Sequence, residues 1–586
     1  EGGVNVAVAS AHATRIFFCH FDVHGKRELH RIELTQRDGH VHYGFISGIK
    51  PGAHYGLRAD GPWQPQDGLR FDSDKLLVDP YATQLDRPYA FHPGLCEQGR
   101  ESKDLVPKGI VTESSPAVKR KPPHAPTWIY ELPIKAFSIR HPGIPSEKRG
   151  TVAALAEPAA LAHFKRLGVD TIELLPLMAW IDERHLHALG LSNAWGYNPV
   201  TFMAPDPRLA PGGFAEIADT VATLHNNGIQ VLLDVVLNHT GESDVAGPTL
   251  SFRGLDNTSY YRHIHGAPVN DTGCGNTVAL DQPLVTDYAT AALRHWVEAT
   301  GIDGFRFDLA TIMGRSTHAA HNGGFHADAP LIRAISADPV LSQSILIAEP
   351  WDVGPGGYQL GNFPKHWLEW NDRFRDDVRR FWRGDGFSTN NLATRLAGSS
   401  DVFAAKSPAA SINFIAAHDG FTLADLTRYV TKHNMANGEG NRDGKSGEVT
   451  WMDGDVRALL ATLFLSRGTP MLTAGDELGR SQQGNNNAYA QDNETTWLDW
   501  ENADQSLITC VADLVALRKA HDLLSRDVFL NGNGDAEWFG ADGKTPDWSN
   551  PALRVLGLVL TGKTARLAIV INGSDDGLPM PLKGGA

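Results

Sequence analysis

The sequence feature that most constrains the fold is a unit of helix, glycine and buried strand that occurs three times. Residues 155–177, 214–237 and 283–308 each contain a helical pattern, then a glycine, then a nearly continuous apolar strand. A glycine at a helix C-terminus supplies the left-handed residue with which many helices end. Strands that are apolar throughout are typical of a parallel sheet covered by helices. The glycines are Gly168, Gly228 and Gly301.

Five further strands complete a predicted set of eight. The repeated units extend from residue 126 to residue 525, which favours an α/β fold of the (β/α)8 or TIM-barrel type over an open doubly wound sheet. No glycine-rich loop of the dinucleotide-binding or phosphate-binding kind follows a strand, which argues against nucleotide binding. The five strands are predicted within residues 127–137, 345–348, 367–370, 412–417 and 470–474.

Two β-rich regions flank the barrel. Residues 1–125 alternate short apolar runs with turn residues, which predicts an N-terminal β-sandwich closed by a Pro-rich, extended linker at residues 107–126. Residues 526–586 return to short β runs and predict a C-terminal β-domain. Within the barrel, residues 179–211 and 241–281 are polar excursions far longer than ordinary loops. Such loops leave the carboxyl ends of barrel strands, where active sites lie in this architecture.

Composition narrows the classes of function. The formal net charge of −15 argues against nucleic acid or an anionic membrane as a partner. The four cysteines are scattered without a C-x-x-C pair, which disfavours a zinc site or a disulfide scaffold and favours a reducing, cytoplasmic location. No apolar run is long enough to span a membrane, and no signal peptide is visible in the sequence.

Polar side chains follow the predicted strands at their carboxyl ends. An apolar strand that ends in a carboxylate or an imidazole places a group that is costly to bury at the rim, where water or substrate meets it. For any single strand, a capped end or a structural ion pair explains such a residue equally well. Four occurrences in one barrel favour a functional site instead. The residues are Asp234 and His239, Arg306 and Asp308, Glu349, and His418 and Asp419.

These residue types suit the cleavage of an acetal, which needs a carboxylate nucleophile and a carboxylic acid for the leaving oxygen. Arg306 and Asp308 are two positions apart in a strand, so they project to the same side, and the cation keeps the carboxylate ionised. Glu349 ends an apolar strand, where desolvation suits an acid. Asp419 is a further anion that can favour positive charge at the anomeric carbon. The two rim histidines can donate hydrogen bonds to sugar hydroxyls.

Four segments resemble, in order and spacing, the signature segments of the α-amylase superfamily, glycoside hydrolase family 13. They are residues 234–239, 304–308, 348–352 and 414–419. Within this superfamily, the chain is similar to the isoamylase and bacterial glycogen debranching group, and the similarity covers nearly the whole chain. The supporting motifs occur at residues 195–199, 204–207, 272–277, 348–352, 436–439, 441–444 and 484–488.

The resemblance implies a catalytic barrel behind a glycogen-binding module of the family 48 type. It also implies retaining hydrolysis of α-1,6 branch linkages in glycogen or phosphorylase-limit dextrin. By this resemblance, Asp308 corresponds to the nucleophile, Glu349 to the acid/base and Asp419 to the transition-state stabiliser, while Tyr197 matches the aromatic residue that stacks on the sugar. The residues that match the surroundings of that sugar are Asp234, His239, Arg306 and His418. No cofactor is implied, and no full set of calcium ligands is visible at the catalytic site.

The chain departs from the family pattern at both ends, which are short, and in the segment after residues 441–444, which is shorter than expected near the leaving-group side. Branch-length preference therefore stays open between limit dextrin and the longer branches that an isoamylase cuts in amylopectin. A non-catalytic glucan-binding barrel protein is the alternative from another class. The presence of Asp308, Glu349 and Asp419 argues against it.

Overall fold

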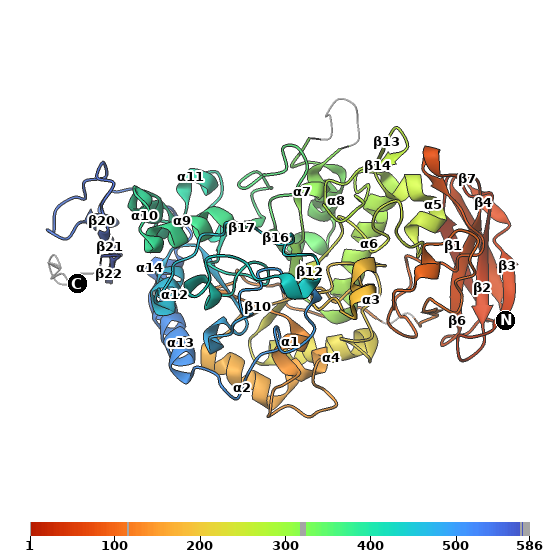
Figure 1. The fold of residues 1–586 in the computed structure, drawn as a ribbon, viewed down its shortest axis with the longest axis horizontal. Coiled ribbons are helices and arrows are strands. Elements are labelled where there is room, and N and C mark those ends of the chain that lie inside the picture. Colours follow the sequence, from red (N-terminus) through yellow and green to blue (C-terminus); the bar gives the residue numbers. More distant parts are fainter. Residues whose placement is uncertain (1, 114–115, 317–323, 575–576, 578–586) are drawn as a thin grey trace. The chain divides into compact units, whose positions relative to one another are not determined.

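The structure is a computed structural model that describes residues 2–113, 116–316, 324–574 and 577 (Figure 1). The chain divides into two compact units. Unit 1 comprises Glu1–Pro123, Gly150–Ala156 and Leu174–Pro364, and unit 2 comprises His124–Arg149, Glu157–Glu173 and Lys365–Ala586. Within the described ranges, no helix is both long and apolar enough to cross a membrane.

The N-terminal strands form two antiparallel sheets and a short hairpin, in agreement with the predicted sandwich. In β2 (Arg15–Phe21), Ile16 and Phe18 are buried, as alternation along a strand requires. The prediction of a linker over residues 107–126 is wrong at its start, because β9 (Gly109–Ile110) pairs with β6 (His54–Asp60) and so belongs to a sheet. One sheet has the strand order β1 (Gly3–Ala9), β5 (Val41–Ser47) and β4 (Gln36–Asp38). The other sheet has the order β3 (Glu28–Glu33), β2, β6 and β9. The hairpin consists of β7 (Trp63–Gln64) and β8 (Leu69–Arg70).

Eight strands close into a parallel barrel, which confirms the predicted (β/α)8 fold. Nearly all of their residues are buried, as expected for strands that read as continuous apolar runs. In barrel order the strands are β10 (Ile129–Leu132), β11 (Thr171–Leu174), β12 (Gln230–Val235), β15 (Gly304–Phe307), β16 (Ile345–Ala348), β17 (Leu368–Asn371), β18 (Ser411–Asn413) and β19 (Thr469–Thr473).

The three helices of the repeated unit lie where the sequence predicts them. They are α2 (Pro158–Leu167), α4 (Gly213–Asn226) and α6 (Pro283–Thr300). Gly168 and Gly301 end α2 and α6 with φ values of 66° and 78°, in the left-handed region that glycine adopts at little cost. The other helices include α1 (Ile134–Ser138), α7 (Thr311–Gly314), α8 (Pro330–Ala337), α9 (Asp372–Arg383), α10 (Ser388–Leu396), α11 (Ser400–Phe403), α12 (Val456–Leu465), α13 (Gln505–Ala520) and α14 (Asp522–Ser525).

One barrel strand is shorter than expected. Residues 412–417 are predicted as a strand, but β18 ends at Asn413. Asn413 lies opposite Pro470 of β19, and a proline has no N–H with which to extend the ladder. Residues 414–417 stay buried but leave the sheet, so the segment that carries His418 and Asp419 approaches the rim as irregular chain.

The two long excursions contain their own short elements, in unit 1. Glu242 organises the second excursion, because its carboxylate accepts hydrogen bonds from the N–H groups of Leu250 at 2.6 Å and Arg253 at 2.7 Å and from the hydroxyl of Tyr261 at 2.5 Å. A buried carboxylate bound in this way fixes the surrounding backbone. The elements are α3 (Arg184–Leu189), α5 (Phe252–Tyr260), β13 (His263–Ile264) and β14 (Ala267–Pro268).

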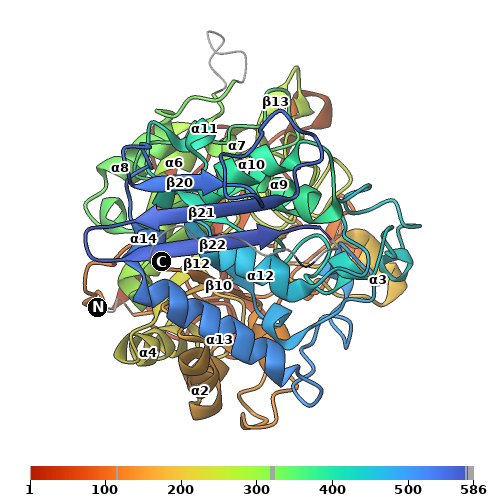
Figure 2. The same ribbon diagram turned by 90° about the vertical axis from the view of Figure 1, so that its left-hand side faces the viewer.

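A three-stranded antiparallel sheet lies near the end of the described chain, in unit 2 (Figure 2). Its strands are β20 (Ala536–Phe539), β21 (Val555–Thr561) and β22 (Arg566–Asn572). This sheet agrees with the predicted C-terminal β-domain. The division at residues 125 and 525 into three domains stays a prediction.

We expect Gly304→Ala to destabilise the protein. Gly304 pairs with Ile345 across β15 and β16, and a Cβ on Gly304 would lie 2.0 Å from the Ile345 carbonyl oxygen. Because that neighbour is backbone, the strands must separate, and overpacking of this kind costs about 1–3 kcal/mol or more. The measurement is the free energy of unfolding in urea.

The matched control is Gly44→Ala in β5, where a Cβ would lie 3.6 Å from Leu34 Cδ2, an ordinary contact. That variant is expected to stay within about 0.5 kcal/mol of the wild type. Equal stability of the two variants would contradict the close approach of β15 and β16.

Candidate active site

Arg306 is the centre of a buried cluster in unit 1. The side chain stands on β15 and is 0% exposed. Its Nη1 donates to the carboxylates of Asp234, at 3.0 and 3.1 Å, and Asp308, at 3.1 Å. Its Nη2 lies 3.2 Å from Glu349 Oε1. Burial lowers the pKa of Arg306, but the charges of Asp234 and then Glu349 outweigh burial and raise that pKa well above its ordinary value.

Asp308 is held at both carboxylate oxygens. Arg306 binds Oδ1, as the two-residue repeat of a strand predicts, and Asn238 Nδ2 donates to Oδ2 at 2.8 Å. The same amide also donates to the main-chain oxygen of Asp308 at 2.8 Å. Asp308 follows directly after β15, and its side chain keeps 14% exposure. The Asp308 carboxylate is therefore oriented by Arg306 and Asn238 and stays partly exposed to solvent.

The backbone after Asp308 ties this residue to Glu349. Leu309 has a φ of 40°, a conformation that costs free energy for a residue with a side chain. In this conformation the Leu309 N–H donates to Glu349 Oε2 at 2.6 Å, and the Ala310 N–H donates to the Glu349 main-chain oxygen at 2.9 Å. The peptide segment that directly follows Asp308 thus binds Glu349, which holds the two residues in a fixed relation.

Two further predicted residues pack on the same cluster. The Tyr197 hydroxyl donates to Asp234 Oδ2, so the phenol ring is anchored at its polar end. His239 is buried, and its Nε2 and Nδ1 lie 2.9 Å from the Tyr197 carbonyl oxygen and 2.6 Å from Asn238 Oδ1. Burial lowers the pKa of His239, although both ring nitrogens face oxygen acceptors and Asp308 lies near.

The remaining two predicted residues lie in unit 2, beyond β18. His418 is buried, and its Nδ1 lies 2.7 Å from Glu131 Oε1 on β10. Glu131 Oε2 also accepts from the Thr473 hydroxyl at 2.6 Å, so the imidazole is fixed by a carboxylate that is itself held. Asp419 is exposed. Burial lowers the pKa of the neighbouring Arg375, but Asp376 foremost, with Asp372 and Asp419, outweighs burial and raises that pKa.

A pocket of about 90 Å³ in unit 2 includes Asp419 in its lining. Asn486 connects its walls: the backbone carbonyl accepts from the Gly420 N–H at 3.0 Å, and Nδ2 donates to Glu448 at 2.7 Å and to the Lys445 carbonyl at 2.8 Å. Glu448 is in turn paired with Arg379 at 2.9 Å. The short segment after residue 444 is thereby fastened beside Asp419.

Two residues with clear roles in this geometry were not identified from the sequence. Asn238 orients Asp308, and Glu131 orients His418. Glu131 has a detectable signal, because it is a carboxylate inside an apolar strand and must therefore be paired. Asn238 has none beyond its place next to His239, since an amide at a strand end is common.

The unit 1 cluster can perform acid–base and nucleophilic chemistry at one carbon. It offers an oriented carboxylate, a second carboxyl tied to it and a tyrosine ring beside them. In the described part of the chain, no group of three or more His, Cys, Asp or Glu side chains is arranged to hold a metal ion.

Comparisons with known proteins give one family over the full length. Residues 1–82 match the model of carbohydrate-binding module 48, the isoamylase N-terminal domain. The glycogen debranching enzyme of Serratia proteamaculans (strain 568) is 44% identical over 620 residues, which cover 100% of this chain and 92% of that protein. The glycogen debranching enzyme of Salmonella typhi is 44% identical over 584 residues, which cover 94% and 87%.

Solved structures share the fold at lower identity. The pullulanase of Anoxybacillus sp. LM18-11 complexed with maltotetraose has a TM-score of 0.74 at 23% identity, over 100% of this chain and 83% of that chain. The pullulanase of Paenibacillus barengoltzii in complex with maltohexaose and α-cyclodextrin has a TM-score of 0.73 at 22% identity, over 100% and 90%. These structures support the barrel architecture.

We expect Arg306→Met to destabilise the protein by about 3–5 kcal/mol at pH 7, because it leaves three carboxyls, two of them buried, without their cation. Ionising those carboxyls then costs more in the folded than in the unfolded state. The decrease in the free energy of unfolding should therefore be small near pH 4 and below, and it should grow as the pH rises. Urea unfolding at pH 4 and pH 7 measures it.

Arg457→Met is the control, because Arg457 is 47% exposed and its Nη2 lies 3.9 Å from the carboxylate of Asp504. Its effect should stay below about 1 kcal/mol at both pH values. A pH-independent loss in Arg306→Met would show that Arg306 acts by packing and not by charge.

Proposed function

This chain belongs to the family of glycogen debranching enzymes, and from that premise we propose how its residues divide the reaction. It is a glycoside hydrolase that removes α-1,6-linked branches in glycogen metabolism. The observation that carries the residue assignment is the tie between Asp308 and Glu349 around Arg306. A retaining mechanism needs two carboxyl groups at a fixed, short separation, and the peptide that follows Asp308 supports this by binding Glu349.

In the first step, the Asp308 carboxylate attacks the anomeric carbon of the branch sugar. The bond from that carbon to the O6 oxygen of the main chain breaks, and the carboxyl group of Glu349 gives its proton to the leaving oxygen. Arg306 and Asn238 hold Asp308 from behind, so its exposed side faces the sugar. Asp419 favours the positive charge that develops on the sugar ring in the transition state.

In the second step, water replaces Asp308 on the anomeric carbon. Glu349, now a carboxylate, takes the proton of the attacking water, and Asp308 leaves as a carboxylate. Two inversions give net retention of the α configuration. Tyr197 supplies a ring for the sugar to stack on, while Asp234 and His418 bind its hydroxyls. Both ring nitrogens of His239 already face oxygen acceptors, so His239 acts by holding Asn238 and the Tyr197 backbone in place.

The substrate is proposed to be glycogen trimmed to short branches, the limit dextrin. The support is the pocket that includes Asp419, since Lys445, Glu448 and Asn486 fasten a short segment beside it and leave about 90 Å³. The module matched by residues 1–82 supports glucan as the partner. The net charge of −15 supports the absence of nucleic-acid and membrane partners, and four free cysteines support a cytoplasmic location.

We expect Asp308→Asn to lower kcat on branched dextrin by at least about 10³-fold, because a neutral amide cannot serve as the nucleophile. Binding to glycogen, measured by affinity electrophoresis, should persist. The matched control is Asp287→Asn, an exposed residue of α6, which should keep wild-type turnover. Turnover of Asp308→Asn at the wild-type rate would support the glucan-binding alternative and reject the catalytic assignment.

We expect short linear maltooligosaccharides to be released faster from phosphorylase-trimmed glycogen than from intact amylopectin, because the segment beside Asp419 limits the room for a long branch. Reducing-end assays with chromatographic product analysis measure both rates. Equal rates on the two polymers would reject the limit-dextrin assignment in favour of a broader isoamylase-type activity.

A further inference from the structure

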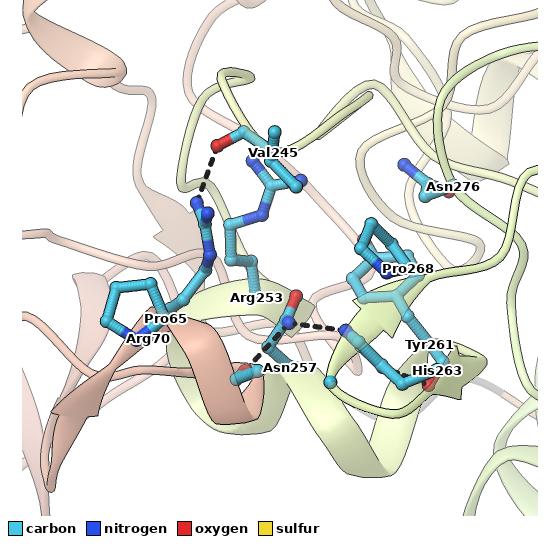
Figure 3. Close-up of a pocket in the computed structure, with 11 residues that line it drawn as sticks. Pro65, Arg70, Val245, Arg253, Asn257, Tyr261, His263, Pro268 and Asn276 are labelled. Carbon is cyan, nitrogen blue, oxygen red and sulfur yellow. Dashed lines mark hydrogen bonds between the residues drawn. The ribbon is translucent and has the colours of Figure 1, made fainter.

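A small recess in unit 1 lies between the N-terminal module and the second excursion (Figure 3). On one side are the hairpin residues around β8, including Arg70, which fall within the part matched by the carbohydrate-binding module. On the other side are α5 and the hairpin of β13 and β14, with Arg253, Asn257 and His263. Figure 3 shows the two arginine side chains next to each other at one wall of the recess.

Arg253 is buried, at 4% exposure, and has no carboxylate partner within 4.0 Å among the described residues. Its Nη1 donates to the Pro248 carbonyl at 3.1 Å, and its Nη2 donates to the Ser243 and Asp244 carbonyls at 2.9 and 2.8 Å. Its Nε is buried with no hydrogen-bond partner in the described structure. A buried donor without an acceptor costs free energy, so an acceptor in the recess would remove that cost.

Arg70 places a second guanidinium beside Arg253. Its Nη1 donates to the Val245 carbonyl at 2.6 Å, while its Nε and Nη2 make no hydrogen bond within the described part. Burial, and after it the charge of Arg253, lower the pKa of Arg70. The carboxylate of Asp244 lies near but is bound at 2.8 Å by both of its oxygens to Arg184. Two like charges thus share a wall with only neutral carbonyls bound to them.

The other polar groups of the recess are already engaged. His263 is a neutral ring, because its Nδ1 donates to the Tyr261 carbonyl at 2.9 Å and its Nε2 accepts from Asn257 at 2.9 Å, and burial lowers its pKa. The Tyr261 hydroxyl donates to Glu242. Among the lining side chains that the structure describes, the donors that remain free are those of the two arginines.

The size of the recess limits what can enter. Its volume of about 20 Å³ is close to the room that one water needs. A whole metabolite does not fit inside. One oxygen atom of an oxyanion does fit inside, while the other oxygen atoms of that anion stay at the mouth of the recess. Guanidinium groups match the geometry of phosphate oxygens.

We propose that Arg70 and Arg253 form a binding site for a small oxyanion of the phosphate class. One oxygen of the anion accepts from Arg253 Nε inside the recess, and another accepts from Arg70 at the mouth. The anion then neutralises two adjacent cations and joins the N-terminal module to the second excursion of the barrel. The site is separate from the carboxylates proposed to cleave the glucan.

Titration calorimetry of the full chain with inorganic phosphate, at constant ionic strength, tests the site. Thermal unfolding in phosphate, sulfate and chloride at matched ionic strength is the second measurement. We expect phosphate and sulfate to raise the midpoint above its value in chloride, because only an oxyanion reaches both arginines. Arg70→Gln, which removes the half-buried cation, should weaken phosphate binding about tenfold or more.

Arg100→Gln is the matched control, because Arg100 also lies in the N-terminal region but makes only a surface ion pair with Glu97, at 3.4 Å. It should bind phosphate like the wild type, and Arg70→Gln should keep wild-type turnover on branched dextrin. Two results would overturn the proposal. One is an equal midpoint of thermal unfolding in phosphate and in chloride, and the other is phosphate binding by Arg70→Gln that equals that of the wild type.

Discussion

The burial of Arg306 against three carboxylates is the constraint on which the rest of the site depends. A guanidinium removed from water needs charged partners or hydrogen-bond acceptors, and around Arg306 these are Asp234, Asp308 and Glu349. One cation against three acids also leaves an excess of negative charge in the cluster. In the proposed mechanism, that excess suits a sugar which becomes positive in the transition state.

The barrel converts this pairing into a fixed geometry. Parallel pairing of β12, β15 and β16 places Asp234 beside Arg306 and Phe307 beside Ala348, so the residues after Phe307 and Ala348 meet at the same level. The left-handed turn at Leu309 then directs its N–H at Glu349. A strained residue persists only where surrounding contacts hold it, and here those contacts are the hydrogen bonds to Glu349.

The sequence predicts the parts of this structure that follow from periodicity and burial. Helices ended by glycine, apolar strands and carboxylates at strand ends are local patterns, and α2, α4, α6, β15 and β16 lie where they indicate. Contacts between distant residues have no such pattern. Asn238 reaches Asp308 and Glu131 reaches His418 only because the barrel brings their strands together. The early end of β18 likewise depends on Pro470, which is distant in sequence but opposite in register.

Branch selection is a different physical problem from bond cleavage. Cleavage needs oriented carboxyls, which strands provide, whereas selection needs a wall of defined position, which irregular segments must provide. Asn486 makes such a wall rigid by binding Gly420, Lys445 and Glu448 at once. Glu448 is buried and paired with Arg379, whose guanidinium also donates to the Ile415 carbonyl, so the wall is anchored to the segment that carries Asp419. We therefore propose that a change in the length of the segment after residue 444 alters the room beside Asp419, and with it the branches that the enzyme accepts.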